Sequence, residues 1–122
     1  MLKAELTGAG EVPPVRSRGI GLLKAILDTE TKTLTWTVSH SGLSGIPISA
    51  HFQGPVSYTG VTLEQNASIQ IDVTANLTSG FKGSTTITDA HIKDLRDGRW
   101  YFNIHTRGKP NGEIRGPIVR SN

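Results

Sequence analysis

The chain has 122 residues, of which 13 are basic and 10 are acidic, and it contains no cysteine. One hydrophobic core serves a chain of this length, so we expect a single domain spanning residues 1–122. The dispersed charges argue against a nucleic-acid-binding protein, and the lack of cysteine excludes disulfides and thiolate chemistry.

The first predicted elements form an antiparallel hairpin. Residues 33–40, TLTWTVSH, alternate apolar and polar side chains, a pattern typical of a half-buried strand. Residues 19–28, GIGLLKAILD, predict its partner strand, and the polar TETK segment between them predicts the turn.

Two further alternating segments, residues 46–53 and 68–77, predict strands with one buried face. In the first of them, His51 and Gln53 alternate with Ala50 and Phe52, so the two polar residues are expected on the outer face.

Residues 88–98, TDAHIKDLRDG, predict one short helix near residues 89–97. Thr88 suits the N-cap and Gly98 suits a left-handed end. Ile92 and Leu95 supply its apolar contacts, and we expect His91 to face solvent.

The C-terminal segments 99–105 and 112–119 predict a second hairpin. A register that places Ile104 opposite Ile114 pairs apolar side chains throughout. The same register leaves four polar side chains together on the outer face, namely Asn103, His105, Glu113 and Arg115. Short strands with regular turn signals predict an all-β fold, an antiparallel Greek-key β-sandwich of the immunoglobulin type with one short helix.

Two interpretations of the polar residues follow. In the first, His51 and His105 bond to loop backbone, and Glu113 and Arg115 hold the strands in register. In the second, the two imidazoles bind copper or zinc, with Glu113 orienting a ligating ring. Common hydrolase and nucleotide-binding motifs are missing from the sequence, so no catalytic residue is predicted.

Four separated motifs carry a family resemblance. They are ELTGAGEVPPV (5–15), SGLSG (41–45), AHFQGPV (50–56) and YFNIHTRGKPNGEIRG (101–116). In this order and spacing the chain resembles the CHRD domain, the chordin-type domain common in exported bacterial proteins. The resemblance covers nearly the whole sequence.

The resemblance implies further properties. The family is similar to copper/zinc superoxide dismutases, which implies the same sandwich and places His51 and His105 at ligand-like positions. Gln53 stands where the family usually has a second histidine, so dismutase activity is not expected. Independently of the resemblance, the two prolines beside Glu11 hold it in a fixed direction, so we expect Glu11 to reach Arg115 or another basic group and to clamp its loop.

We therefore expect a non-enzymatic CHRD domain that acts as a binding or structural module. A polar cluster is expected at one end, formed by Glu11, Gln53, Asn103, Glu113 and Arg115 with the two histidines. The alternatives are a copper- or zinc-binding protein using His51 and His105, and a subunit of a surface assembly. The partner is expected to be a protein or surface ligand.

The family resemblance implies an extracytoplasmic location, in the periplasm, in the medium or on the cell surface. The N-terminus MLKAELTGAG lacks a signal-peptide pattern, so we expect any export signal to have been removed. No run approaches the ~20 apolar residues of a membrane-spanning helix, so no membrane insertion is expected.

Overall fold

The computed structural model describes residues 1–56, 66–73 and 76–121. These residues form nine strands, one α-helix and a short 3-10 helix. In chain order the elements are β1 (Leu2–Thr7), η1 (Gly8–Gly10), β2 (Ile20–Asp28), β3 (Thr33–Ser41), β4 (Pro47–Gln53), β5 (Ile69–Val73), β6 (Phe81–Thr86), α1 (Asp89–Arg96), β7 (Tyr101–Thr106), β8 (Ile114–Pro117) and β9 (Val119–Arg120).

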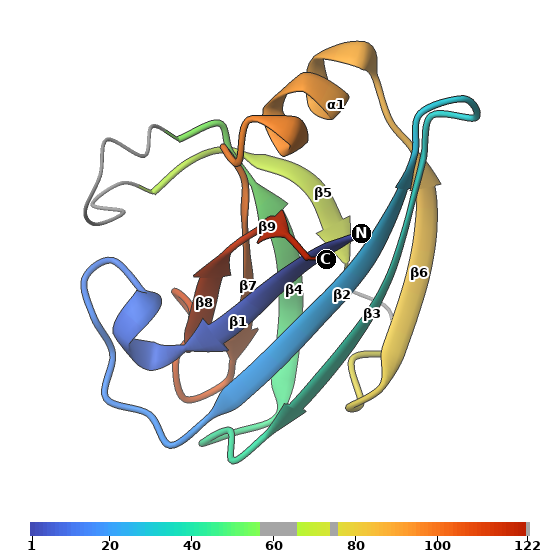
Figure 1. Ribbon diagram of the computed structural model, residues 1–122. Coiled ribbons are helices and arrows are strands. Elements are labelled where there is room, and N and C mark those ends of the chain that lie inside the picture. Colours follow the sequence, from blue (N-terminus) through green and yellow to red (C-terminus); the bar gives the residue numbers. More distant parts are fainter. Residues whose placement is uncertain (57–65, 74–75, 122) are drawn as a thin grey trace.

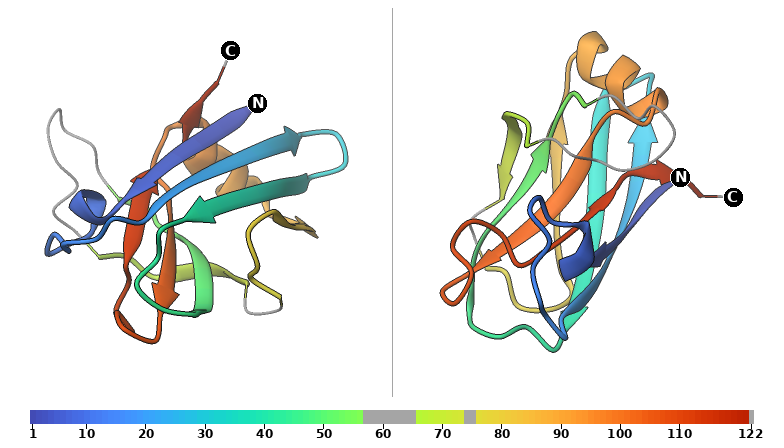
Figure 2. Two further views of the ribbon diagram at one scale, coloured as in Figure 1. Left: turned by 90° about the horizontal axis from the view of Figure 1, so that it is seen from below. Right: turned by 90° about the vertical axis from the view of Figure 1, so that its left-hand side faces the viewer.

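All nine strands belong to one antiparallel sheet. Eight of them follow the order β5-β4-β7-β8-β1-β2-β3-β6, and β9 pairs with β1. The sheet curls into a half-barrel, so that β2, β3 and β6 turn toward β4 and β7 (Figures 1 and 2). The prediction of antiparallel strands with one short helix is confirmed. The two-sheet Greek-key sandwich is not confirmed, because hydrogen bonding runs continuously from β5 to β6.

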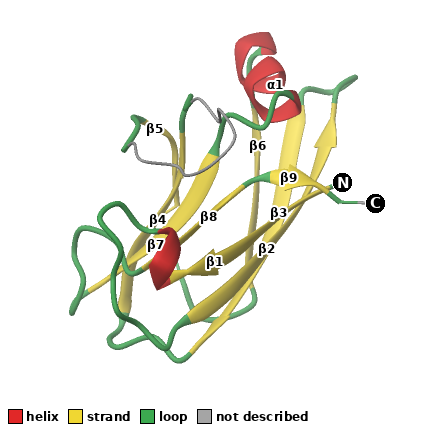
Figure 3. Cartoon of the chain, turned by 60° about the vertical axis from the view of Figure 1, so that its left-hand side comes forward, coloured by secondary structure: helices red, strands yellow, loops and turns green. Residues whose placement is uncertain are grey.

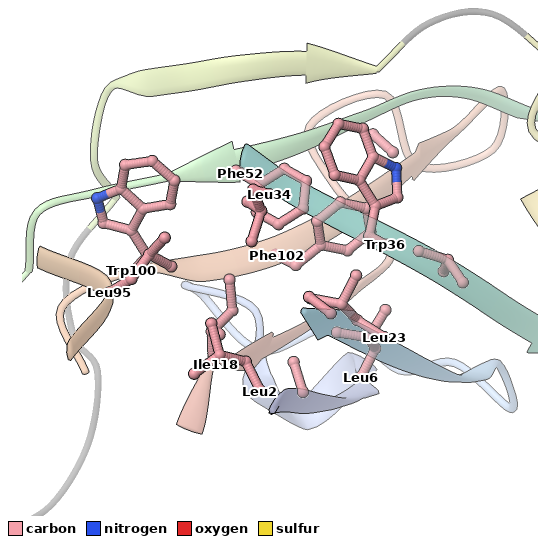
Figure 4. Close-up of a cluster of buried hydrophobic side chains, with 14 of the residues drawn as sticks. Leu2, Leu6, Leu23, Leu34, Trp36, Phe52, Leu95, Trp100, Phe102 and Ile118 are labelled. Atoms are coloured by element: carbon pink, nitrogen blue, oxygen red, sulfur yellow. The ribbon is translucent and has the colours of Figure 1, made fainter. Parts of the chain in front are cut away.

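The hydrophobic core fills the concave side of this curl (Figure 4). Trp36 of β3 meets Phe52 of β4 edge to face with ring centroids 5.0 Å apart, and Phe52 meets Phe102 of β7 at 4.8 Å. The first contact joins strands from opposite arms of the sheet, and the second joins the neighbouring strands β4 and β7. Each large ring buries enough apolar surface to contribute roughly 2 kcal/mol or more, so the aromatic contacts stabilise the curl itself.

Helix α1 covers one end of the curl, and η1 lies away from it, on the side of the molecule toward the other end (Figure 3). Thr88 accepts a hydrogen bond from the backbone N–H of His91 and so caps α1, and Gly98 follows with φ +69°. Both cap predictions are confirmed. The prediction that His91 faces solvent is wrong, because the residue is half-buried. The centre of its ring lies 5.1 Å from that of Trp100, and its Nδ1 accepts a hydrogen bond from the Thr88 backbone N–H.

Both predicted hairpins are present. β2 pairs with β3 over its whole length, and β7 pairs with β8 with Ile104 opposite Ile114 and Asn103 opposite Arg115, as predicted. The strand predicted at 68–77 is shorter, because β5 ends at Val73, and residues 74–75 lie outside the described part of the chain.

Candidate functional site

The end of the curl near η1 gathers loops from distant parts of the sequence around one buried carboxylate. Glu113 is fully buried. It accepts hydrogen bonds from Ser17 Oγ at 2.6 Å, from Ser44 N at 2.8 Å, and from Ser44 Oγ and Thr106 Oγ1 at 2.7 Å each. One side chain therefore ties the loop after η1 and the β3–β4 turn to the end of β7.

These donors fix the charge state of Glu113. Burial by itself raises the pKa of a carboxyl group, because the low-dielectric interior disfavours the charged form. Here hydrogen bonds from Ser17, Ser44 and Thr106 outweigh burial, and the pKa of Glu113 lies below its usual value. At neutral pH this side chain is an ionised, saturated acceptor.

Arg115 lies two residues further along the chain, in β8, and is 1% exposed. Its guanidinium carbon stands 3.6 Å above the centre of the Tyr101 ring, and Nη1 donates to Asn66 Oδ1 at 2.8 Å. A guanidinium in contact with an aromatic face gains a cation–π attraction, which is stronger where water is excluded. Arg115 thus anchors the segment at Asn66 to the outer face of the sheet.

Gln53 and Tyr101 hold the neighbouring residue of the same segment. Gln53 Nε2 donates to Ala67 O at 2.7 Å, and Tyr101 Oη accepts from Ala67 N at 3.0 Å. Asn103 lies beside them in the sheet, opposite His51 on one side and Arg115 on the other. It is buried, and its Oδ1 has no hydrogen-bond partner among the described residues.

The two histidines predicted as metal ligands are in direct contact. His51 Nδ1 lies 3.1 Å from His105 Nε2, and the rings meet at 63°. His51 Nε2 also lies 3.3 Å from Asp72 Oδ1, and His105 Nδ1 lies 2.8 Å from Pro110 O. A line of polar atoms therefore crosses three adjacent strands, β5, β4 and β7.

The outer partners select the tautomers of both rings. A carbonyl oxygen only accepts, so His105 carries its proton on Nδ1 and leaves a lone pair on Nε2. Burial and the charge of His105 lower the pKa of His51, while Asp72 opposes this shift. A neutral His51 that donates from Nε2 to Asp72 has its own lone pair on Nδ1. In that state two nitrogen lone pairs face each other across 3.1 Å.

Glu11 is the second buried carboxylate, and its side chain lies against Gly112 of the β7–β8 loop. It follows η1, and its backbone N–H donates to Gly8 O. The side chain is 4% exposed, and Oε2 has no hydrogen-bond partner among the described residues. Burial raises the pKa of Glu11 to about 7, although the positive charge of Arg115 lowers it.

The predicted polar residues of β4, β7 and β8 are cross-strand neighbours, but the predicted residues make separate sets of contacts. Glu113 binds loop hydroxyls, Gln53 and Arg115 bind the segment at Asn66 and Ala67, and His51 lies against His105. The partners Ser17, Ser44, Asn66 and Asp72 are not among the predicted site residues. Two of them carried a signal: the strand pattern places Asp72 on the outer face, and Ser44 belongs to the SGLSG motif.

Among the described residues, no group of three or more His, Cys, Asp or Glu side chains is arranged to hold a metal ion. Nor does any described helix have the length and apolar character needed to cross a membrane.

A curled antiparallel sheet whose polar residues bind loops to its rim defines a β-rich module. The family model of the CHRD domain matches residues 2–118, so the chain belongs to the CHRD domain family. No curated protein and no solved structure matches the chain. The likeness to copper/zinc superoxide dismutases therefore stays a prediction.

Proposed function

We propose that this CHRD domain is a non-enzymatic binding module that presents preset loops at the η1 end of the sheet. The observation that carries the proposal is the saturation of Glu113 by four hydrogen bonds from three segments. Loops held in place before a ligand arrives lose less conformational entropy on binding, which favours affinity.

The same observation argues against catalysis by this carboxylate. A general base near neutral pH needs a pKa close to 7 and an oxygen within reach of the substrate proton. Glu113 has a lowered pKa, and its side chain is enclosed by loop residues. Its geometry suits a positioning role, and membership of the CHRD family supports a non-enzymatic module.

Hydrogen exchange of the Ser44 backbone amide tests this proposal. The amide donates to Glu113 Oε2, so we expect faster exchange in Glu113→Gln, whose weaker, neutral acceptor releases the loop. Glu30→Gln removes an exposed carboxylate at the β2–β3 turn and is the matched control, for which we expect no change. Unchanged Ser44 exchange in Glu113→Gln would remove the basis of the proposal.

A second candidate function is copper or zinc binding by His51 and His105. The supporting observation is the 3.1 Å separation of Nδ1 and Nε2. Two nitrogens this far apart can both lie about 2.0–2.1 Å from one ion. Asp72 and Pro110 occupy the positions from which outer partners orient ligating imidazoles. Water would supply the remaining ligands.

Copper titration of protein without a histidine tag tests the second candidate. We expect one equivalent to bind the wild type and His40→Ala, in which a histidine outside the pair is removed. His51→Ala and His105→Ala should lose this binding. Equal binding by His51→Ala and the wild type would eliminate the site.

The family also favours an extracytoplasmic location, as expected for a domain that binds a partner outside the cytoplasm. Fractionation of the source cells with an antibody to the domain tests this: recovery in the cytoplasm alone would contradict it.

A further inference from the structure

A cleft of about 260 Å³ lies between two loops near η1. One wall is the segment 11–15, Glu-Val-Pro-Pro-Val, and the other is the β7–β8 loop at 108–112, Gly-Lys-Pro-Asn-Gly. The two loops lie side by side at the η1 end of the molecule (Figure 2, right). The walls contain three prolines, Pro13, Pro14 and Pro110, which offer rigid apolar surface and no backbone donor.

The carboxylate of Glu11 is the acidic group of this cleft. It is held against Gly112, where an added Cβ would lie 2.6 Å from Oε2 and 2.9 Å from Oε1. Gly112 also has φ +121°, so only glycine allows this approach without strain. The loop is therefore shaped around the carboxylate, yet Oε2 receives no hydrogen bond from any described residue.

Two cations lie near the carboxylate, and neither satisfies Oε2. Arg115 acts on Glu11 through its charge, but Tyr101 and Asn66 hold its guanidinium. Lys109 lines the cleft from the opposite wall and makes no hydrogen bond to Oε2. A buried acceptor without a donor costs about 1–3 kcal/mol, and more when it is charged, so a donor from outside would recover that cost.

We propose that this cleft binds a primary alkylammonium group, with Glu11 as its counter-ion. The inference rests on the proposed binding function and names the chemical class of the ligand. The ammonium would pair with the carboxylate of Glu11 where this side chain lines the cleft, and the proline walls would contact the methylene groups. Pockets for drug-sized ligands occupy about 300–1,000 Å³, so this smaller cleft suits a short free amine or one lysine side chain of a partner.

Amide NMR titration at pH 8 tests the inference with three probes: n-butylammonium, Nα-acetyl-lysine N-methylamide and the neutral n-butanol. We expect one or both ammonium probes to give saturable shifts at Val15, Gly108, Lys109 and Gly112, and n-butanol to give none. Tighter binding of butylammonium indicates a free amine, and tighter binding of the lysine derivative indicates a partner side chain.

Three variants make the test specific. Glu11→Gln keeps the size of the side chain and should weaken binding about tenfold or more, because a charge-assisted hydrogen bond is lost. Glu30→Gln should bind like the wild type, and Lys109→Ala should bind as tightly or more tightly. The spectrum of each variant away from the cleft verifies that it is folded.

The inference is overturned if neither ammonium probe gives a saturable shift, if n-butanol binds equally well, or if Glu11→Gln binds as the wild type does. Such a result leaves the Ser44 exchange experiment untouched. Conversely, unchanged Ser44 amide exchange in Glu113→Gln would refute the proposal of preset loops. The shifts that the ammonium probes cause in the wild type would still report directly on the cleft. The two failures are therefore distinguishable.

Discussion

Replacing Glu11 by glutamine should make the protein more stable at alkaline pH. In the folded chain burial raises the pKa of Glu11 from 4.5 to about 7. A raised folded-state pKa contributes stability that is fully present below the unfolded value and is lost as pH rises through the folded value. The wild type therefore loses stability between about pH 4.5 and 7. The Glu11→Gln variant does not lose this stability, because glutamine does not ionise.

The pKa shift gives the magnitude. A change from 4.5 to about 7 corresponds to about 3 kcal/mol of unfolding free energy once the carboxyl is ionised in both states. Part of this loss has already occurred at pH 5, so the advantage of Glu11→Gln over the wild type should grow by about 2–3 kcal/mol between pH 5 and 8.5. Because all other titrating groups are common to both proteins, they cancel in the difference.

Urea unfolding of wild type, Glu11→Gln and Glu30→Gln at the two pH values measures this difference. The exposed Glu30 control should show a difference from the wild type that barely depends on pH. A Glu11→Gln advantage that is the same at pH 5 and 8.5 would refute the reasoning, since it would mean that burial does not hinder ionisation of Glu11.

Three other substitutions probe the same end of the sheet. Glu113→Ala removes the acceptor of four hydrogen bonds and should cost about 3 kcal/mol, or roughly 10 °C in melting temperature; a change under 2 °C would show that the network is dispensable. Gly112→Ala should cost about 1–3 kcal/mol, because φ is +121° and the new Cβ meets the carboxylate of Glu11; unchanged thermal unfolding would contradict that contact. Arg115→Lys should cost about 1 kcal/mol or more in urea unfolding, because an ammonium cannot both cover Tyr101 and reach Asn66; wild-type stability would argue against both contacts.

The local sequence pattern was sufficient to predict the strands whose apolar residues alternate and the helix that has clear capping residues. The β2–β3 and β7–β8 hairpins follow from strict alternation and from apolar cross-strand pairs such as Ile104 and Ile114. The helix follows from Thr88 and Gly98 at its ends. In each case the information lies within one continuous stretch of the chain.

Two longer strands are absent from the prediction, for different reasons. β1 carried a usable signal, because Leu2, Ala4 and Leu6 alternate and are buried. β6 carried little, since Phe81 is its one apolar side chain. Its place depends on Gly83, where an added Cβ would lie 2.6 Å from the Trp36 ring, and no periodic pattern reports such a tertiary contact.

The same distinction holds at the candidate site. The hairpin register predicts that Asn103 and Arg115 are neighbours, and the structure has them paired. The partners of Glu113 and His51 depend on how distant segments meet. Ser17 and Ser44 lie 96 and 69 residues away from Glu113 in sequence, and Asp72 reaches His51 only because β5 pairs with β4.

The central claim is that Glu113 is a saturated anchor for preset loops. The pH titration of its side-chain carboxyl carbon by NMR tests this claim most directly. We expect a midpoint below 4.5, because hydrogen bonds from Ser17, Ser44 and Thr106 stabilise the ionised form. A midpoint near neutral pH would contradict the account, since Glu113 would then be a carboxyl group available for acid–base chemistry.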